Sequence, residues 1–122
     1  MNGLNVKDEQ RTLEDYEILL NTLLPAFPDT LFYLCSLTPV KAKVQDRYER
    51  FTNARIDAFN EGLRELARAH NIYYLHTNDL LRDSKGYLDN EYGTGDGIHL
   101  RASAYQLLAD YLYTHTIPLK EE

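Results

Sequence analysis

The sequence predicts an α/β fold in which a short parallel sheet is flanked by helices. Two short apolar runs, at residues 31–37 and 72–75, are typical of strands, and the residues at 46–70 between them repeat apolar side chains at helical spacing. Further helical patterns precede the first run and follow the second. Two strands joined by a helix of this length predict a right-handed parallel crossover. The length of 122 residues fits a single domain, residues 1–122.

The first predicted helix begins near Thr12, because the segment Thr12–Asp15 places an acid three residues after a capping side chain. Apolar residues then recur at helical spacing, and Pro25 and Pro28 are expected to end the helix. The run that follows, Leu31–Leu37, is almost entirely apolar. Its character predicts a strand buried on both faces, as in parallel sheets.

The second half of the chain continues the alternation. A single long helix is predicted for Asp46–His70, with Asn71 as its terminator, and the second strand, Ile72–Leu75, follows directly. The remaining elements are one helical turn at Asn78–Arg82, a turn at Asp83–Gly86, a glycine-rich loop at Tyr92–Leu100 and an amphipathic helix at Ala102–Thr116.

The predicted sheet is incomplete. Sheets usually have about four to six strands, and an isolated pair of strands is marginally stable. Both predicted strands are apolar enough to be buried on both faces and along their edges, so another strand is expected beside them. We expect either residues that precede Met1 or a second copy of the chain to supply it; in the second case the chain forms a homo-oligomer through the open sheet edge.

Composition excludes several classes of protein. The net charge is −6, with 13 Lys and Arg against 19 Asp and Glu, and no segment is basic enough for nucleic-acid binding. The sequence contains no run of about 18 apolar residues, so no transmembrane helix is expected. The start, Met1-Asn2-Gly3, lacks a signal pattern, so a cytoplasmic location is expected. Cys35 is the only cysteine, which rules out an internal disulfide and a cysteine zinc site. Cys35 itself is expected to be a small core residue.

The most informative segment is the glycine-rich loop before the last helix, which contains Asp96 and His99. An acid three residues before a histidine can accept a hydrogen bond from Nδ1–H, which fixes the tautomer and leaves Nε2 as a general base. Gly97 between them allows a tight loop. The alternative is that Asp96 caps the last helix region while His99 packs beneath it.

Asp96-Gly97-Ile98-His99-Leu100, followed by Tyr105, Leu108 and Ala109, resembles the last signature block of the SGNH hydrolases, also called GDSL esterases. The likeness covers residues 30–112. It implies a partial flavodoxin-like three-layer sandwich, a catalytic role for Asp96 and His99, and no metal or organic cofactor. Gly3-Leu4-Asn5-Val6 is similar to the family's Gly-x-Asn-Asp block, with Val6 in place of the acid. On that alignment Asn5 is an oxyanion-hole donor; otherwise this segment is an ordinary turn.

The family's Gly-Asp-Ser block, which carries the nucleophile, has no counterpart in this sequence. Ser36 is expected inside a strand, Ser84 in a surface turn and Ser103 on the last helix beside His99, so none suits a triad. The chain therefore resembles the second half of the family fold. A metal site that combines His76 and Asp79 with the Asp96–His99 pair is a further possibility, for which the sequence offers little support.

Two functional hypotheses follow. The first is an ester hydrolase acting on a small acyl or acetyl ester, such as an acetylated sugar or a lipid-like molecule, in which the 122-residue chain alone is inactive because it lacks the nucleophilic serine. The second is a non-catalytic α/β module derived from such a hydrolase that associates with itself. Neither hypothesis involves nucleic acid or a membrane.

Overall fold

The computed structural model describes residues 9–48 and 52–116. Their elements are, in chain order, α2 (Glu9–Ala26), β1 (Tyr33–Cys35), α3 (Ala42–Arg47), α4 (Asn53–Ala69), β2 (Tyr73–Leu75), the 3₁₀ helix η1 (Thr77–Leu81) and α5 (Ala102–His115). β1 and β2 pair in parallel, with Tyr33 opposite Tyr73 and Cys35 opposite Leu75. The α/β class and the parallel crossover are therefore confirmed.

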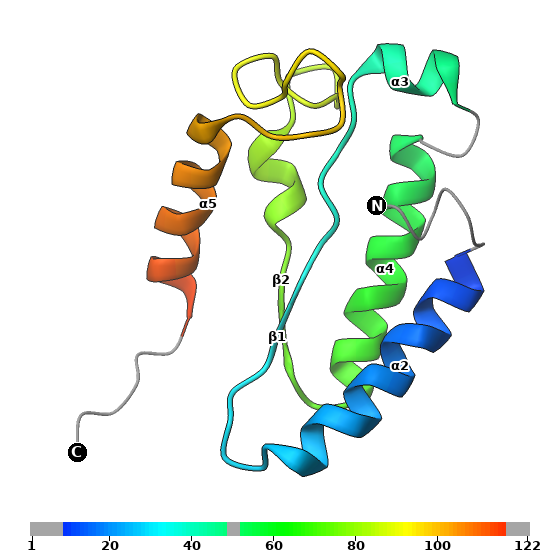
Figure 1. Cartoon of the computed structure of the whole chain (residues 1–122), viewed down its shortest axis with the longest axis vertical. Coiled ribbons are helices and arrows are strands. Elements are labelled where there is room, and N and C mark those ends of the chain that lie inside the picture. Colours follow the sequence, from blue (N-terminus) through cyan, green and yellow to red (C-terminus); the bar gives the residue numbers. More distant parts are fainter. Residues whose placement is uncertain (1–8, 49–51, 117–122) are drawn as a thin grey trace.

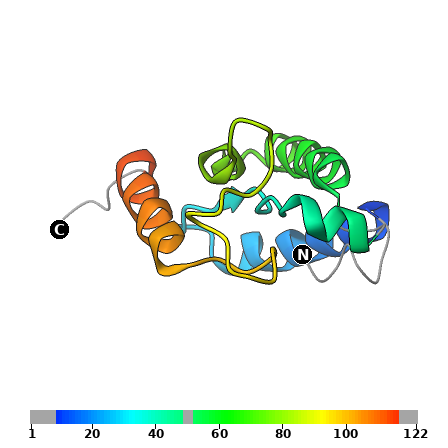
Figure 2. The ribbon, with the colours of Figure 1, turned by 90° about the horizontal axis from the view of Figure 1, so that it is seen from above.

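The described helices lie on both sides of this short sheet. In Figure 1 the two strands run through the middle of the molecule, with α5 to their left and α4 and α2 to their right, and in the view from above in Figure 2 α5 again stands apart from α4 and α2. α4 contacts both strands and α2 contacts α4, whereas α5 rests on η1. This arrangement is the predicted three-layer sandwich with a short parallel sheet.

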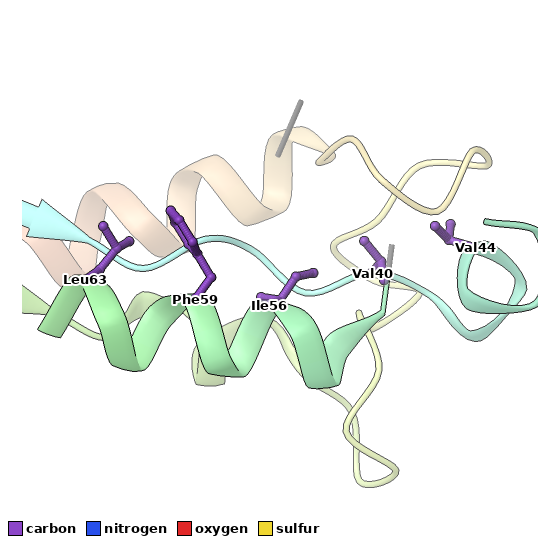
Figure 3. Packing of buried hydrophobic residues seen from close by; sticks show 5 residues of the cluster. All are labelled: Val40, Val44, Ile56, Phe59 and Leu63. Atoms are coloured by element: carbon purple, nitrogen blue, oxygen red, sulfur yellow. The ribbon is translucent and has the colours of Figure 1, made fainter. Parts of the chain in front are cut away.

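The main core forms where α4 meets the chain that leaves β1. The buried side chains Val40, Val44, Ile56, Phe59 and Leu63 pack together, and Figure 3 shows Ile56, Phe59 and Leu63 along one face of α4. Full burial of an aliphatic or aromatic side chain of this kind contributes about 1.5–3 kcal/mol. A second, smaller cluster of Leu81, Leu88 and Ala104 joins η1, the loops and α5.

Two asparagines of α4 hold the segment that follows β1. Asn53 accepts from the backbone N–H of Val40 at 2.9 Å and donates to its carbonyl oxygen at 2.9 Å. Asn60 does the same with Leu37, at 2.7 and 3.3 Å. Both side chains are buried, and they lie two helical turns apart, so one face of α4 replaces the neighbouring strand that this segment lacks.

The predicted single helix Asp46–His70 is wrong only at its start, because two separate helices occupy this region. α3 ends at Arg47, and α4 begins at Asn53, where the hydroxyl of Thr52 accepts from the backbone N–H of Arg55 at 3.1 Å. The N-capping Thr52 and the pairing of Asn53 with Val40 fix this start. α2 differs less: it begins at Glu9 and includes Pro25 in its last turn.

The expectation that both strands are buried on both faces is also wrong for the described chain. Tyr73 is 46% exposed, and Cys35, predicted to lie in the core, is exposed. The reason is that α4 covers one side of the sheet, whereas α5 packs mainly against η1. Within residues 9–48 and 52–116, no other strand pairs with the outer edge of β1.

The later elements lie close to their predicted positions. η1 and α5 match the predicted helical turn and last helix to within one residue at each end, and the turn at Asp83–Gly86 is closed by the N–H of Gly86 donating to the Asp83 carbonyl at 3.1 Å. The apolar side of the amphipathic helix α5 is less buried than expected: Tyr105 on this helix is 61% exposed. None of the described helices has the length and apolar character needed to cross a bilayer.

Candidate active site

The loop that contains the predicted acid–histidine pair is tightly folded. Gly93 and Leu100 form an isolated antiparallel bridge, the N–H of Thr94 donates to the His99 carbonyl at 2.9 Å, and the N–H of Gly97 donates to the Thr94 carbonyl at 3.1 Å. Gly97 has φ of +80°, a conformation that favours glycine. The loop is thereby closed on itself immediately before α5.

Asp96 and His99 face each other within this loop. Nδ1 of His99 makes a hydrogen bond with Oδ2 of Asp96. The other carboxylate oxygen accepts from the Thr94 hydroxyl at 2.7 Å and from the backbone N–H groups of Ile98 and His99 at 2.8 and 2.9 Å. The predicted Asp96–His99 contact is therefore present, and Asp96 does not serve as a helix cap: the N-cap of α5 is Arg101.

These contacts stabilise the charged form of the acid. The hydrogen bond from the His99 side chain, followed by those from the backbone N–H groups of Ile98 and His99 and from the Thr94 hydroxyl, holds the pKa of Asp96 well below its usual range. An ionised Asp96 fixes the imidazole with its proton on Nδ1 and can stabilise a cationic ring. The side chain of His99 is 77% exposed, and no described residue hydrogen-bonds Nε2. The pair is therefore organised to accept a proton at Nε2.

The neighbouring elements hold the loop in position. The backbone N–H of Lys41 donates to the Gly97 carbonyl at 3.0 Å, and Nζ of Lys43 donates to the Gly95 carbonyl. On the other side, Nε of Arg101 donates to the Gly93 carbonyl at 2.7 Å. Ile98 packs against the main core cluster, so the loop is attached both to α3 and to the core.

None of the three serines is placed as a nucleophile for His99. Ser36 is buried, and its hydroxyl accepts from the backbone N–H of Asn78 at 2.9 Å. Ser84 is exposed in the turn at residues 83–86. Ser103 is near His99 in sequence, but its hydroxyl donates to the Glu91 carbonyl at 2.7 Å. Asn5, the predicted oxyanion-hole donor, lies outside the described residues.

His76 forms a separate local pair. Its Nε2 is 3.4 Å from Oδ1 of Asp79, and its Nδ1 is 3.0 Å from the Tyr74 hydroxyl. No three or more His, Cys, Asp or Glu side chains of the described chain come together as a metal site, so this pair does not combine with Asp96 and His99.

Sequence reasoning missed the residues of α3 that support the loop. Lys43 lies 52 positions before Gly95, the residue whose carbonyl it contacts, and nothing local in the sequence signals that contact. The buried asparagines of α4 were equally hidden, although Asn53 directly after Thr52 matches the start of a capped helix.

Comparison with known proteins identifies a family for this chain. The model of the GDSL-like lipase/acylhydrolase family matches residues 2–107. A structure from Streptococcus pneumonia, described as a candidate platelet activating factor, is 29% identical with a TM-score of 0.84, over 93% of this chain and 55% of that one. The search of curated proteins returned no match.

More distant structures share the fold. A GDSL-like lipase from Bacteroides thetaiotaomicron is 17% identical with a TM-score of 0.69, over 88% of this chain and 52% of that one. The esterase domain of the ORF1 protein from the zebrafish ZfL2-1 retrotransposon is 18% identical with a TM-score of 0.68, over 88% and 58%. The chain thus spans little more than half the length of these structures. Its match to the family model over residues 2–107 shows that it belongs to the GDSL-like lipase/acylhydrolase family.

Proposed function

We propose that His99 is the general base of a serine ester hydrolase and that Asp96 is the carboxylate that orients it. The observation that carries the proposal is the hydrogen bond between Asp96 and Nδ1 of His99, in an exposed loop that leaves Nε2 without a described partner. The family match over residues 2–107 supports the same reaction class. The substrate would be a small acyl or acetyl ester, such as an acetylated sugar or a lipid-like ester.

The proposed reaction follows from the proton position. As a serine hydroxyl attacks the ester carbonyl, Nε2 of His99 accepts the hydroxyl proton, and Asp96 stabilises the resulting imidazolium. The tetrahedral intermediate collapses when His99 donates that proton to the departing alcohol. A water molecule, which gives its proton to His99, then attacks the acyl-enzyme. The carboxylic acid leaves as His99 returns the proton to the serine. Asn5 is proposed to donate to the oxyanion, together with backbone N–H groups.

We further propose that the serine comes from a segment outside these 122 residues, so that the chain alone is inactive. Support comes from Ser36 and Ser103, whose hydroxyls are bound to other partners, and from Ser84, which lies in a separate turn. Removal of a triad nucleophile costs on the order of a million-fold in rate.

The test is turnover of p-nitrophenyl acetate. We expect none from the 122-residue chain, and turnover once the chain is fused to the part of the Streptococcus pneumonia protein that it does not cover. In the active fusion His99→Ala should lower kcat by on the order of a million-fold. His115→Ala, which removes an exposed histidine on α5, is the matched control and should retain activity. Turnover by the chain alone that depends on His99 would contradict the proposed absence of a nucleophile.

A second candidate function is a non-catalytic module that associates with itself. It is favoured by the outer edge of β1, which no other described strand pairs with, and by the exposed apolar side chains Leu31 and Tyr73 near the strands. Light scattering should then give the mass of a dimer or larger assembly. A monomer that melts cooperatively would argue against this candidate.

A further inference from the structure

A cavity of about 320 Å³ lies directly beside the acid of the proposed catalytic pair. α3 and its C-cap residue contribute Lys43, Val44, Arg47 and Tyr48, and the loop contributes Gly95, Asp96 and Ile98. Asp96 lines this cavity and also holds His99, so a molecule in the cavity would lie beside the residue that orients the proposed base. The cavity is at the small end of the range for ligand sites, which suits one small functional group with a few carbon atoms.

Two cationic side chains line this cavity. Lys43 and Arg47 are four residues apart on α3, a spacing that places them on the same side of the helix. The guanidinium of Arg47 lies 5.5 Å from the ring centroid of Tyr48, and Nζ of Lys43 is anchored on the Gly95 carbonyl. Both positive groups are therefore positioned at the cavity within a chain whose net charge is −6.

These cations lack the partners that several other cations of the chain have. Arg64, Arg68 and Arg82 each lie within salt-bridge distance of a glutamate or aspartate. No described carboxylate lies that close to Lys43 or Arg47, although Asp96 lines the same cavity. The two oxygens of Asp96 already receive hydrogen bonds from His99, Thr94 and Ile98. With Lys43 and Arg47 as cations and Asp96 as the one carboxylate among its described residues, the lining has a net excess of one positive charge.

From this arrangement we infer that the cavity is an anion subsite that selects esters with an acidic group, a carboxylate or a phosphate, beside the bond to be cleaved. The planar guanidinium of Arg47 can bind such a group through two parallel hydrogen bonds, and Lys43 adds a second positive charge. Val44 and Ile98 would contact the carbon atoms that connect the acidic group to the ester. This inference rests on the proposed function, because it assigns the substrate class of the same site.

The experiment is a titration of the isotope-labelled full chain, followed by amide NMR, with a matched pair of esters. Monomethyl succinate carries one carboxylate at neutral pH, and dimethyl succinate has the same skeleton without a charge. We expect the anionic ester to give saturable shifts at Gly95, Asp96 and Lys43, and the neutral ester to give none. Equal shifts with the two esters would overturn the inference.

Variants separate the cavity from general charge effects. Arg47→Gln removes an exposed side chain and should weaken binding of monomethyl succinate by about tenfold, the loss expected for a charge-assisted hydrogen bond. Arg68→Gln removes another exposed arginine, on α4, and is the control that should leave binding unchanged. Unaltered amide positions elsewhere would verify that both variants are folded. Equal effects of the two substitutions would refute the assignment.

This titration needs no turnover, so it is independent of the kinetic test of His99. Loss of the selective binding would refute the anion subsite and leave the proposed hydrolase standing. Retained binding, combined with a fusion protein whose turnover does not depend on His99, would refute the proposed hydrolase and leave the anion site.

Discussion

Replacing Gly97 by alanine should destabilise the chain far more than the same change two residues earlier. Gly97 has φ of +80°, which costs a residue with a side chain about 1–2 kcal/mol. The added Cβ would lie 2.6 Å from Cγ2 of Val44 and 3.2 Å from Cβ of Lys41. Relief of such overpacking costs about 1–3 kcal/mol. Together the two effects predict a loss of about 2–5 kcal/mol in the free energy of unfolding.

Gly95→Ala is the matched control. Apart from Gly95 and its two chain neighbours, no described residue comes within 4 Å of a Cβ built at Gly95, and its φ is not positive, so the substitution should change the free energy of unfolding by less than about 1 kcal/mol. Urea denaturation followed by circular dichroism at 222 nm measures both variants. Equal stability of Gly97→Ala and Gly95→Ala would refute the reasoning, because the two positions of this loop would then tolerate a side chain equally well. A loss confined to Gly97→Ala supports the fixed path of the loop that carries Asp96 and His99.

Three further changes have defined outcomes. Asn60→Ala leaves the N–H of Leu37 without its acceptor and should cost about 1–3 kcal/mol in urea denaturation, whereas an exposed control such as Asn90→Ala should cost little. Leu88→Ala empties a site that is 1% exposed and should cost about 2–5 kcal/mol; a smaller loss would mean that the second core cluster collapses around the gap. Asp96→Asn should lower stability at neutral pH but not in strong acid.

The sign of the pH effect follows from the direction of the pKa shift. Folding lowers the pKa of Asp96 below its ordinary value of 3.8, so the folded chain binds the proton less tightly than the unfolded chain. The carboxylate therefore stabilises the fold fully above about pH 4, and this contribution is lost as pH falls through the lowered pKa. The free energies of unfolding of the native chain and of Asp96→Asn should therefore become equal in that acidic range. A difference in unfolding free energy between the two chains that stays constant from pH 7 to strong acid would contradict this role of the carboxylate.

The sequence determined those features that depend on neighbouring residues. Helical spacing and the two short apolar runs predicted the alternation of helices and strands, apart from α3, and the parallel crossover, and η1 and α5 match their predicted ranges to within one residue. The contact between Asp96 and His99 was also predictable, because a carboxylate and an imidazole three residues apart in a tight glycine loop are within reach of each other whatever surrounds them.

Contacts between distant segments decided the rest. α4 begins at Asn53 rather than continuing from Asp46, and the side chain of Asn53 binds Val40, 13 positions earlier. Cys35 is exposed although its run is apolar, because burial depends on which layers cover the sheet. The meeting of Lys43 with Gly95, and hence the cavity beside Asp96, joins residues 52 positions apart. Spacing along the chain fixes only local geometry, whereas these contacts exist because the tertiary structure places α3 against the loop before α5.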